Sequence, residues 1–427
     1  MTTRGLLFVG AAFAALGLAA SAADWPQWRG PHRDGVSQET GLLREWPKDG
    51  PKLLWQVNDV GSGYSTPAVA GDRLYLLANK GLDNEYVEAR RVEDGKPVWT
   101  TRVGKVGNPN QRPPYPGARS TPTVDGDRLY ALGSDGDLVC LDAATGKERW
   151  HKNLRTDFGG QPGQWAYAES PLIDGNALVC TPGGTEATLV ALNKNTGDLI
   201  WKAAVPGGDQ AAYASVIVVE AGGVKQYVQF LAKGVVGVDA KTGKFLWRDD
   251  RTAKGSPANI PTPVAHGGAV YTASGLAGSG LVRLKAAGGG VEAEPGYYSR
   301  KLPNSIGGSV VVGDYLYGTN ATGLLCVEFA TGKVKWEDRC VGAGAVCCAD
   351  GRLYVHGEDD RVALVEATPD AYREKGRFTL PGKPEHAFRF GPGEKAWAYP
   401  VVANGRLYLR DLGVLWCYDV KAPAADK

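Results

Sequence analysis

The cysteines are the most reactive side chains in this chain of 427 residues, and two of them, Cys347 and Cys348, are adjacent. A disulfide between neighbouring cysteines requires a strained turn. In a β-strand, neighbouring side chains point to opposite faces of the sheet instead. The surrounding residues 345–351 align with the opening strand of a repeated unit. We therefore expect no disulfide between Cys347 and Cys348.

The remaining cysteines give little sign of chemistry. Cys140, Cys326 and Cys417 occupy one equivalent position in three copies of a repeated strand. At such a position a cysteine most simply serves as a small buried apolar residue. Because the chain has seven cysteines, an odd number, at least one thiol stays unpaired or pairs between chains in an oxidising compartment. The pairing of the seven is left open.

Metal-binding and catalytic motifs are not evident in the sequence. The histidines have no spacing typical of a metal site, and we interpret each of them as a turn or core residue. They are His32, His151, His266, His356 and His386. The sequence contains no Cys-x-x-Cys-His haem motif, no nucleophile elbow and no phosphate-binding loop. We therefore predict no catalytic residue.

A set of polar and aromatic residues stands just before the opening strands of the repeated units. Residues 164–167 (Gln-Trp-Ala-Tyr) and 396–399 (Ala-Trp-Ala-Tyr) resemble each other, so one interpretation is packing shared by all repeats. The alternative is that these side chains surround the mouth of a central channel, where aromatic rings and an arginine hold a ligand. The ligand-binding candidates are Tyr64, Arg119, Trp165, Tyr167, Glu169, Tyr213, Asn259, Asn304, Trp397 and Tyr399.

The elements that must position these residues are copies of one unit. Residues 140–150 contain a small residue, an Asp, a Thr-Gly pair and a Trp ten positions after the small residue. Copies occur at residues 191–201, 237–247 and 326–336, with a looser copy at 89–99. Successive copies are 46 to 51 residues apart from Trp99 to Trp247, which indicates a repeat architecture. The tryptophans expected to dock neighbouring units are Trp55, Trp99, Trp150, Trp201, Trp247 and Trp336.

Each unit has the pattern of four antiparallel strands. Opening strands such as those in residues 65–75 and 120–130 run through a Gly-containing turn into an apolar pair, which is typical of a hairpin. Eight such openings predict an all-β fold, an eight-bladed β-propeller of four-stranded antiparallel blades. The last unit ends one strand early, and residues 53–57 form a strand without a neighbour. We expect this N-terminal strand to close the propeller, which leaves no open edge.

The repeats predict one domain because stacked units share a continuous core. We assign residues 53–422 to the propeller, residues 23–52 to an extended segment that lies against it, and residues 423–427 to a short tail. The fifth and seventh units lack the Thr-Gly and Trp ending. Candidate substitutes for the missing Trp are Tyr297, Tyr298 and Phe378.

The first 22 residues have the features of a secretory signal peptide, with Arg4, an apolar run at residues 6–20 and a small-residue cleavage site at residues 20–22. No Cys follows that run to carry a bacterial lipid anchor, and no other stretch approaches the about 20 apolar residues of a membrane span. We expect a periplasmic or extracellular protein with no transmembrane segment after cleavage. The formal net charge of +2 gives no general basis for binding nucleic acid.

The repeat at residues 237–247 and its copies resembles the tryptophan-docking repeat of the pyrroloquinoline quinone (PQQ) propeller superfamily, and the resemblance extends from Trp55 to Val420. Residues 25–31 (Trp-Pro-Gln-Trp-Arg-Gly-Pro) also resemble the opening of exported bacterial PQQ-binding-like propellers. The superfamily includes PQQ-dependent alcohol and sugar dehydrogenases and cofactor-free scaffolds such as BamB. The dehydrogenases hold PQQ between a Trp and an adjacent-cysteine disulfide, bind Ca²⁺ through Glu and Asn, and use an Asp as base.

The resemblance implies two alternative functions. Glu186 lies in a turn similar to the one that carries a Ca²⁺-binding Glu in the dehydrogenases, but a single carboxylate is a weak metal candidate because Ca²⁺ prefers six to eight oxygen ligands. The sequence has no Asn-Pro-Trp-Asn segment and no Trp-Asp base motif. We expect a monomeric, non-catalytic binding or scaffold propeller without a cofactor, which engages a protein, peptide or glycan on its loop face. The alternative is a PQQ- and Ca²⁺-dependent quinoprotein dehydrogenase.

Overall fold

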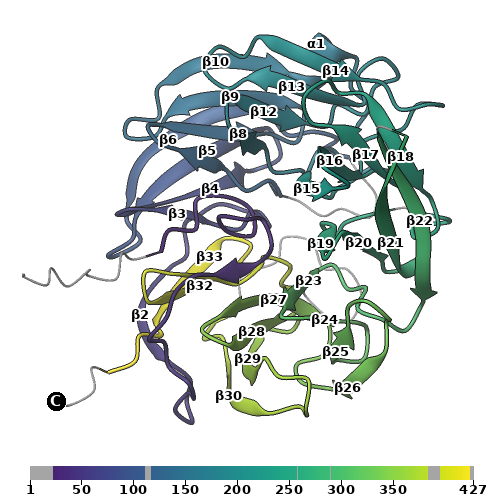
Figure 1. Cartoon of the computed structure of the whole chain (residues 1–427). Helices are drawn as coiled ribbons and strands as arrows, with labels where there is room; N and C mark the ends of the chain where they lie inside the picture. The colour runs from purple at the N-terminus through teal and green to yellow at the C-terminus, as the bar shows by residue number, and fades with distance from the viewer. Residues whose placement is uncertain (1–22, 111–116, 257, 289, 383–394, 424–427) are drawn as a thin grey trace, which may run out of the picture.

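Eight β-sheets stand side by side around a central axis (Figure 1). The computed structural model describes residues 23–110, 117–256, 258–288, 290–382 and 395–423. Each sheet contains four antiparallel strands, and one sheet carries in addition a short parallel strand, β1 (Val36–Ser37). The predicted eight-bladed β-propeller is confirmed.

The first four blades follow the chain in order, each from the axis outward. Blade 1 consists of β3 (Ala68–Ala70), β4 (Arg73–Lys80), β5 (Asn84–Arg91) and β6 (Pro97–Lys105). Blade 2 consists of β7 (Thr123–Asp125), β8 (Arg128–Leu132), β9 (Asp137–Asp142) and β10 (Glu148–Asn153). Blade 3 consists of β11 (Leu172–Asp174), β12 (Ala177–Cys180), β13 (Leu189–Asn193) and β14 (Leu199–Ala203). Blade 4 consists of β15 (Ile217–Ala221), β16 (Val224–Phe230), β17 (Val235–Asp239) and β18 (Phe245–Asp249).

The next four blades continue around the axis. Blade 5 consists of β19 (Val264–His266), β20 (Ala269–Ser274), β21 (Gly278–Ala287) and β22 (Gly290–Ser299). Blade 6 consists of β23 (Ser309–Val312), β24 (Tyr315–Thr319), β25 (Leu324–Glu328) and β26 (Val334–Asp338). Blade 7 consists of β27 (Gly344–Ala349), β28 (Arg352–Gly357), β29 (Arg361–Glu366) and β30 (Glu374–Thr379). Blade 8 consists of β31 (Val401–Ala403), β32 (Arg406–Asp411), β33 (Val414–Asp419) and β2 (Lys52–Val57).

A single short helix, α1 (Leu154–Phe158), stands among these strands in the described ranges, between blades 2 and 3. The Asn153 side chain caps it by accepting hydrogen bonds from the backbone N–H groups of Arg155 and Thr156. Over the same ranges, no helix has the length and apolar character needed to cross a bilayer.

The Asp-x-x-Thr-Gly sequence builds the turn between the third and fourth strands of a blade. In blade 2, Asp142 Oδ1 accepts hydrogen bonds from the Thr145 backbone N–H at 3.0 Å and from Thr145 Oγ1 at 2.8 Å. Asp239 and Thr242 make the same two bonds in blade 4. The residue after the Thr, Gly146 in blade 2, adopts a φ of 73°, a left-handed conformation that favours glycine.

The same glycine receives the tryptophan of the preceding blade. A Cβ added to Gly146 would lie 2.5 Å from the ring of Trp99, so only glycine leaves room for the indole. Trp99 Nε1–H donates to the Ala143 carbonyl oxygen of the same turn at 3.2 Å. The other tryptophans that donate to a carbonyl of the following blade are Trp55, Trp150, Trp201 and Trp336. These five tryptophans and the turns that receive them form the docking belt.

Two blades depart from this pattern. Trp247 packs against blade 5, but its Nε1–H donates to Gln226 Oε1 within its own blade because the receiving blade has no Asp-x-x-Thr-Gly turn. Trp247 therefore docks on the next blade by packing, as expected, but without the hydrogen bond to a carbonyl of that blade that the other five tryptophans make. In blade 5 itself, the Tyr297 hydroxyl donates to the Phe329 carbonyl oxygen at 3.0 Å and replaces the missing indole. Phe378 packs in the core instead.

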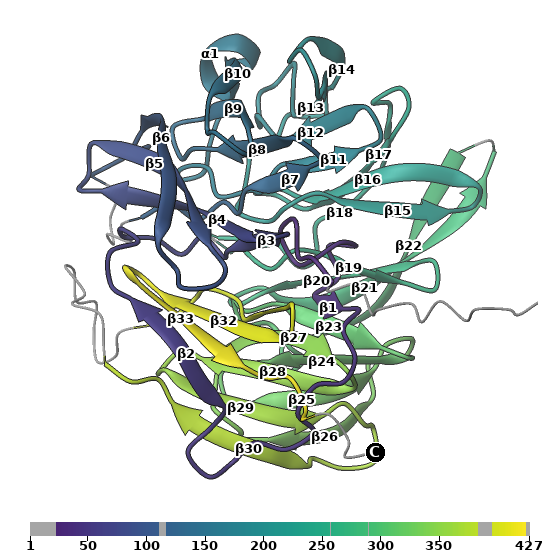
Figure 2. The same cartoon turned by 90° about the vertical axis from the view of Figure 1, so that its left-hand side faces the viewer.

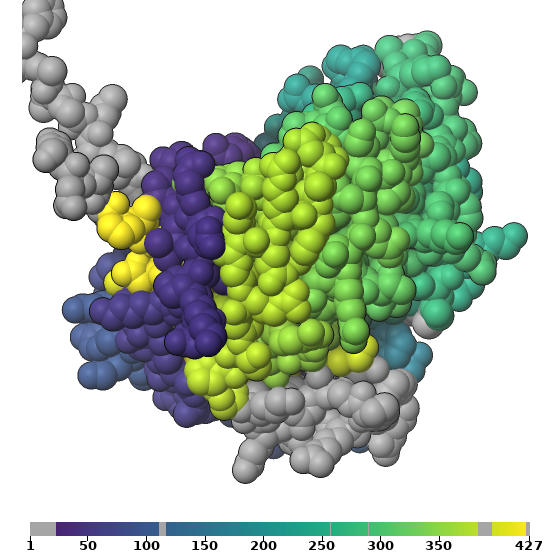
Figure 3. Space-filling view, turned by 90° about the horizontal axis from the view of Figure 1, so that it is seen from below, coloured from purple at the N-terminus to yellow at the C-terminus, as the bar shows by residue number. Residues whose placement is uncertain are grey.

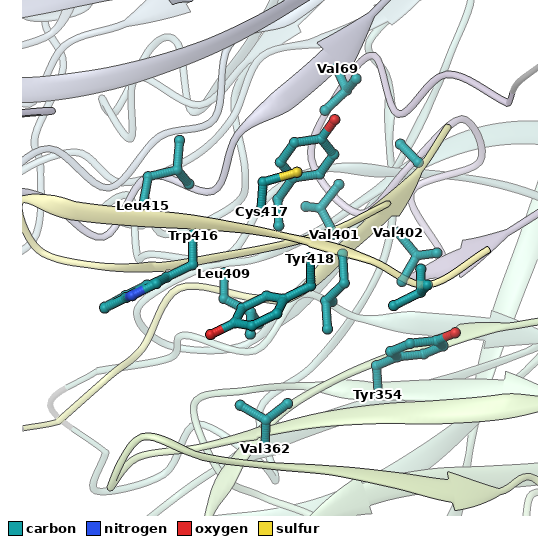
Figure 4. Close-up of a cluster of buried hydrophobic side chains, with 14 of the residues drawn as sticks. Val69, Tyr354, Val362, Val401, Val402, Leu409, Leu415, Trp416, Cys417 and Tyr418 are labelled. Atoms are coloured by element: carbon teal, nitrogen blue, oxygen red, sulfur yellow. The ribbon is translucent and has the colours of Figure 1, made fainter. Parts of the chain in front are cut away.

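The hydrophobic core is divided among the contacts between neighbouring blades. The largest cluster of buried side chains joins blades 7, 8 and 1. Figure 4 shows Tyr354 and Val362 of blade 7 facing Leu409 and Tyr418 of blade 8, with Val69 of blade 1 beyond them. Six smaller clusters join the other neighbouring blades within the described residues. Each blade therefore depends on its neighbours to bury its two faces.

Strand β2 closes the propeller. It pairs in antiparallel orientation with β33, and Trp55 stands opposite Cys417. Figure 3 shows the N-terminal residues (purple) beside the yellow-green surface of blade 7, where the outer strand of blade 8 belongs. The predicted closure by the N-terminal strand is confirmed.

Residues 24–35 pass across the axis, and we call them the axial segment. Trp25 exchanges two backbone hydrogen bonds with Val69 in the innermost strand of blade 1. The Val124 backbone N–H of blade 2 donates to the Pro26 carbonyl oxygen at 2.7 Å. The Arg33 guanidinium donates to two carbonyl groups next to blade 3. Three consecutive blades therefore hold one side of this segment.

The axial segment also reaches the opposite side of the channel. Trp28 Nε1–H donates to Thr262 Oγ1 next to blade 5 at 2.9 Å, and the Arg29 guanidinium donates to a carbonyl group of blade 6. The Gly35 carbonyl oxygen accepts a backbone hydrogen bond from blade 7. Figure 2 shows the purple chain that leads into β1 beside the inner strands β19 and β23. The expected extended segment thus lies on the axis, a position that the sequence did not indicate.

Candidate functional site

A cavity of about 500 Å³ lies at the centre of the propeller, and we call it the aromatic cavity. Its walls are the loops that lead into the innermost strands of blades 1 to 6 and 8, and Trp28 of the axial segment forms its floor. The described residues that line it are Trp28, Tyr64, Arg119, Trp165, Ala168, Ser170, Tyr213, Ser215, Ala258, Ile260, Ile306, Lys395, Trp397 and Tyr399.

Six aromatic side chains line this cavity, and they pack in three pairs. Trp28 and Tyr399 meet edge to face with their ring centroids 4.6 Å apart. The centroids of Tyr64 and Trp397 are 5.3 Å apart. Those of Trp165 and Tyr213 are 5.8 Å apart. Offset and tilted pairs of this kind are favourable, and they leave the outer faces of the rings available to a third group.

Hydrogen bonds fix the aromatic rings in place. The Tyr399 hydroxyl donates to the Ile306 carbonyl oxygen at 2.7 Å. The Tyr213 hydroxyl accepts a hydrogen bond from the Trp165 backbone N–H at 3.0 Å. Trp397 Nε1–H donates to a Glu358 carboxylate oxygen at 3.0 Å. Because the rings are already held, a ligand that contacts them loses little free energy in ordering the site.

Two cationic side chains line the cavity. Lys395 Nζ lies 2.7 Å from Glu358 Oε2, so its charge is balanced by a carboxylate that does not itself line the cavity. Arg119 Nη1 donates to the Trp165 carbonyl oxygen at 3.0 Å, and burial lowers the pKa of its guanidinium. Even a lowered arginine pKa leaves the side chain charged at neutral pH. The wall thus carries a positive charge among aromatic rings.

The carboxylate of Glu85 lies near Arg119 and is fully buried between blades 1 and 2. It accepts a hydrogen bond from the Ser134 backbone N–H at 2.6 Å and another from the Ser134 hydroxyl. Burial raises its pKa to about 7, because desolvation of the ionised form outweighs these hydrogen bonds and the attraction of Arg119. At neutral pH the carboxyl group is therefore only partly ionised.

Six of the ten ligand-binding candidates line the aromatic cavity. They are Tyr64, Arg119, Trp165, Tyr213, Trp397 and Tyr399. The structure brings them together from five different blades, as expected if the loops before the innermost strands converge. Their role in binding a ligand stays a prediction.

The other four candidates are placed elsewhere, which corrects the expectation that they stand at the channel mouth. Tyr167 packs in the core between blades 2 and 3. Glu169 is buried with a pKa that burial raises to about 8, and Gln229 Nε2 lies 3.4 Å from its Oε2. Asn259 donates to the Leu231 carbonyl oxygen at 2.7 Å. Asn304 bonds to Thr319 through its backbone.

The floor residue Trp28 was not among the candidates. It belongs to the axial segment, which has no counterpart in the repeats, so the repeat pattern could not place it. The only signal was the aromatic and Pro-Gly-rich motif at residues 25–31. The apolar residues Ile260 and Ile306 and the basic residue Lys395 were also not predicted, because single residues of these types in a loop indicate nothing by themselves.

The residues that would correspond to the metal and quinone sites of the dehydrogenases do not come together. Glu186 is exposed in a turn of blade 3 and does not line the cavity. Cys347 packs toward blade 8 and Cys348 toward blade 6, on opposite faces of β27, and both are buried free thiols. No cluster of three or more His, Cys, Asp or Glu side chains that could hold a metal ion occurs in the described part of the chain.

Three histidines of the described ranges, His151, His266 and His356, have structural settings. His356 is buried, its Nδ1 lies 3.2 Å from the Ala398 carbonyl oxygen, and burial lowers its pKa. His151 and His266 each lie close to one aspartate, at 2.9 and 3.2 Å. His386 lies outside the described residues.

Comparison with known proteins gives one family and several distant relatives. The family model described as outer membrane protein assembly factor BamB matches residues 83–338, more than half of the chain. Tetrathionate hydrolase of Acidithiobacillus ferrooxidans is 24% identical over 328 residues, 64% of this chain and 59% of that protein. BamB of Burkholderia pseudomallei is 24% identical over 284 residues, 64% of this chain and 66% of that protein. The chain thus matches less than two thirds of the length of either relative.

Solved structures with a similar arrangement of strands come from proteins of different names. BamB from Moraxella catarrhalis superposes with a TM-score of 0.59 at 16% identity, covering 87% of this chain and 99% of that one. Quinohemoprotein alcohol dehydrogenase from Comamonas testosteroni superposes with a TM-score of 0.52 at 14% identity, covering 95% of this chain and 81% of that one. At these identities the similarity shows the fold alone.

Proposed function

The chain belongs to the PQQ-like β-propeller family described as outer membrane protein assembly factor BamB, and from this premise we propose that it is a non-catalytic binding propeller. In this proposal the ligand is a segment of a protein or peptide, and it enters the aromatic cavity. The observation that carries the proposal is the cavity itself, in which three fixed aromatic pairs surround about 500 Å³. Its described lining contains no His, Cys, Asp or Glu side chain that could serve as a general base or a metal ligand.

The size of the cavity favours a side chain or a short peptide segment over a large rigid ligand. Drug-sized ligands and peptide anchors occupy pockets of about 300–1,000 Å³, and the cavity falls within this range. Aromatic rings and arginine are also the residues that contribute most to protein recognition sites. The name assembly factor, borne by the BamB relatives, agrees with a role in binding other proteins.

A glycan, which the sequence left open as a ligand, is less well supported by the lining. Sugar hydroxyl groups act as donors as well as acceptors, and their donors need acceptor groups in the site. The described lining contains no Asp, Glu, Asn or Gln side chain. The side-chain acceptors of the described lining are serine and tyrosine hydroxyl oxygens, so a neutral glycan would find fewer acceptors here than in a site with carboxylates or amides.

The residues of the cavity do not fit a Ca²⁺-dependent quinone site. Ca²⁺ prefers carboxylate and amide oxygens, whereas the described lining supplies two cations and no carboxylate. Cys347 and Cys348 cannot clamp a planar ring together, because they project from opposite faces of a buried strand. The quinoprotein dehydrogenase therefore remains the alternative function, and a direct test with PQQ and Ca²⁺ decides between the two.

The proposal includes export to the periplasm or the extracellular space. Its basis is the signal-peptide pattern of residues 1–22, which lie outside the described residues. Cleavage after residue 22 is checked by mass spectrometry of protein recovered from the periplasm and the medium. Retention of the full-length chain in the cytoplasm would contradict this part of the proposal.

The binding function is tested by selecting peptides from a displayed random library on the purified protein. The matched control is the double variant Trp165→Ala/Trp397→Ala, which removes one ring from each of two aromatic pairs. We expect peptides enriched on the native protein to lose at least tenfold in affinity for the variant. Enrichment of the same peptides on both proteins would place the binding site outside the aromatic cavity and contradict the proposal.

The dehydrogenase alternative is tested separately with PQQ and Ca²⁺. The protein is titrated with both, absorbance is followed, and a dye-linked assay is run with a primary alcohol and with glucose. The binding proposal predicts no saturable PQQ binding and no substrate-dependent reduction of the dye. Dye reduction that requires PQQ, Ca²⁺ and substrate together would overturn it.

A further inference from the structure

Two buried serine hydroxyl groups in the wall of the aromatic cavity keep a hydrogen-bond donor for a ligand. Ser170 Oγ accepts a hydrogen bond from the Thr121 backbone N–H at 2.9 Å, and Ser215 Oγ accepts one from the Ser170 backbone N–H at 2.9 Å. A serine hydroxyl has one donor and two acceptor sites. Neither hydroxyl hydrogen has an acceptor among the described residues. Both O–H groups can therefore donate to a group inside the cavity.

Acceptors are scarcer in this lining. Its described side chains include no Asp, Glu, Asn or Gln. Several of its backbone carbonyl groups already accept a hydrogen bond from a side chain, namely those of Trp165, Ser170, Ala258 and Ile306. A buried donor without an acceptor costs free energy. A ligand that matches the cavity should thus bring acceptors and few donors.

The charges of the lining do not call for an ionic ligand. Lys395 Nζ is paired with Glu358 at 2.7 Å. The Arg119 guanidinium donates to the Trp165 carbonyl oxygen and lies within electrostatic reach of Glu85. Both cations therefore have partners within the protein, and a ligand need not supply a countercharge.

Aromatic rings make up much of the remaining wall. Trp28 and Tyr399 meet edge to face, and their hydrogen bonds to Thr262 and Ile306 hold both rings in place. Ring surface of this kind gains free energy when apolar parts of a ligand cover it. Aromatic-lined sites in other proteins bind proline-rich segments in this way, because the polyproline II conformation is already formed before binding and loses little entropy.

Proline also meets the donor and acceptor requirement of the cavity. It has a backbone carbonyl group but no N–H. In the polyproline II conformation these carbonyl groups make no internal hydrogen bonds. A run of prolines thus presents apolar rings and acceptors and brings no backbone donor. Any other residue would add an N–H group that needs an acceptor in the wall.

We propose that the segment that enters the aromatic cavity is proline-rich and binds in the polyproline II conformation. Its pyrrolidine rings pack on the aromatic side chains, and its carbonyl oxygens accept hydrogen bonds from the Ser170 and Ser215 hydroxyl groups. This inference rests on the proposed binding function and specifies the class of peptide that the cavity takes.

The experiment measures the affinity of three uncharged probes for the purified protein by isothermal titration calorimetry. They are acetylated and amidated hexaproline, the corresponding hexamer of sarcosine (N-methylglycine), and Ac-Gly-Phe-Gly-Gly-Phe-Gly-amide. Sarcosine lacks the N–H group but has no ring, whereas the Phe peptide has apolar rings and keeps its N–H groups. Because only hexaproline combines both features, we expect it to bind at least tenfold more tightly than either of the others.

Variants test the two hydroxyl groups. Ser170→Ala/Ser215→Ala should lose at least tenfold in affinity for hexaproline. The matched control is Ser65→Ala, which removes a buried serine oxygen that accepts the Leu77 backbone N–H at 3.0 Å but does not line the cavity. It should bind hexaproline like the native protein. Thermal unfolding verifies that each variant is folded, and if the double variant is not, each single variant should lose about threefold.

Two outcomes overturn the inference. One is that hexaproline binds the native protein no more tightly than the Phe peptide or the sarcosine hexamer. The other is an undiminished affinity for hexaproline in the folded serine variants. In either case, library peptides without proline that lose affinity for Trp165→Ala/Trp397→Ala still support the proposed binding function. If no probe and no library peptide binds, the proposed function itself fails.

Discussion

The docking belt and the aromatic cavity use the same kind of side chain for different ends. In the belt, Trp99 covers the turn glycine Gly146 and donates to a backbone carbonyl of the next blade. In the cavity, Trp165 packs on Tyr213 and keeps part of its surface exposed. Both indoles are half-buried, so they differ in what they face: Trp99 lies on a turn of the next blade, whereas Trp165 lines the cavity. A tryptophan therefore indicates function here only through the surface or space that it faces.

This difference implies that stability and binding are separable by substitution. Belt residues join neighbouring blades, so their loss should lower the free energy of unfolding and leave the cavity intact. Cavity residues pack against each other on the axis, so their loss should act mainly on affinity. The contrast extends to pH, because Glu85 near the cavity is buried whereas Asp142 in the belt is half-buried and paired with Arg149.

The largest expected effect is a difference in stability loss between Trp150→Ala in the belt and Trp165→Ala in the cavity. Trp150 Nε1–H donates to the Lys194 carbonyl oxygen at 3.0 Å, and Trp150→Ala should lower the free energy of unfolding by about 3 kcal/mol, near the lower end for large-to-small core changes. Trp165→Ala should cost less than about 1 kcal/mol but weaken peptide binding at least tenfold. Urea unfolding and fluorescence titration measure the two quantities. Equal losses of stability would break the distinction between belt and cavity.

The next effect concerns pH and the carboxyl group of Glu85. Its pKa is raised to about 7 in the folded protein, so the folded state holds a proton that the unfolded state releases near pH 4.5. The contribution of Glu85 to stability therefore falls as pH rises through this window, by about 2 to 3 kcal/mol between pH 5 and pH 8 relative to Glu85→Gln. Urea unfolding of both proteins at several pH values measures the difference.

Asp142 in the docking belt should make stability depend on pH in the opposite direction. Hydrogen bonds from Arg149 and Thr145 lower the pKa of Asp142 to about 2. Its stabilising contribution is present above its usual pKa and is lost as pH falls toward 2.

The prediction for Glu85 also has an outcome that contradicts it. If the destabilisation of the native protein relative to Glu85→Gln grew on acidification, Glu85 would be ionised in the folded state, contrary to its burial.

A smaller effect isolates the contact between a turn glycine and the docked indole. Gly146→Ala and Gly126→Ala both place a side chain at a left-handed φ, 73° and 60°, which costs about 1–2 kcal/mol. Gly126 has open space around a Cβ, whereas Gly146 meets the Trp99 ring at 2.5 Å. Gly146→Ala should therefore lose about 2 kcal/mol more than Gly126→Ala in urea unfolding. The same loss for both variants would mean that backbone strain alone explains the cost of replacing Gly146, and that contact with the indole adds nothing.

The smallest effect tests the one hydroxyl that replaces an indole in the belt. Tyr297→Phe removes the donor to the Phe329 carbonyl oxygen and should cost about 1 kcal/mol, the net value of one hydrogen bond. The control Tyr315→Phe removes a hydroxyl outside the belt and should change stability by less than about 0.5 kcal/mol. If Tyr297→Phe is neutral, ring packing alone docks blade 5.

The fold could be predicted from the sequence because one local unit explains most of it. The Asp-x-x-Thr-Gly turn is fixed by bonds between residues three positions apart, such as Asp142 and Thr145, and it therefore repeats wherever those residues repeat. Closure was also predictable, since a missing strand at one end matched an extra strand at the other. Trp247 behaved differently because its partner turn in blade 5 is absent.

The cavity was predictable only in part. Trp165 and Tyr167 stand two positions apart, a spacing that places both on one face of an extended chain, yet Ala166 between them adopts a φ of 67°. This turn sends Trp165 to the cavity and Tyr167 to the core. Trp28 depends on a contact with Thr262, 234 positions away, which no local pattern encodes.

The pairing of β2 with β33 brings the two ends of the polypeptide together, and Glu39 bonds to Gly405 across 366 positions. A chain synthesised from its N-terminus holds its first strand without a partner until the last strand is made. Contacts so distant in sequence form slowly, and until they form the incomplete array exposes two strand edges, which are templates for aggregation. The rate at which β2 pairs with β33, more than the stability of any single blade, therefore determines how long the newly made protein exposes these edges.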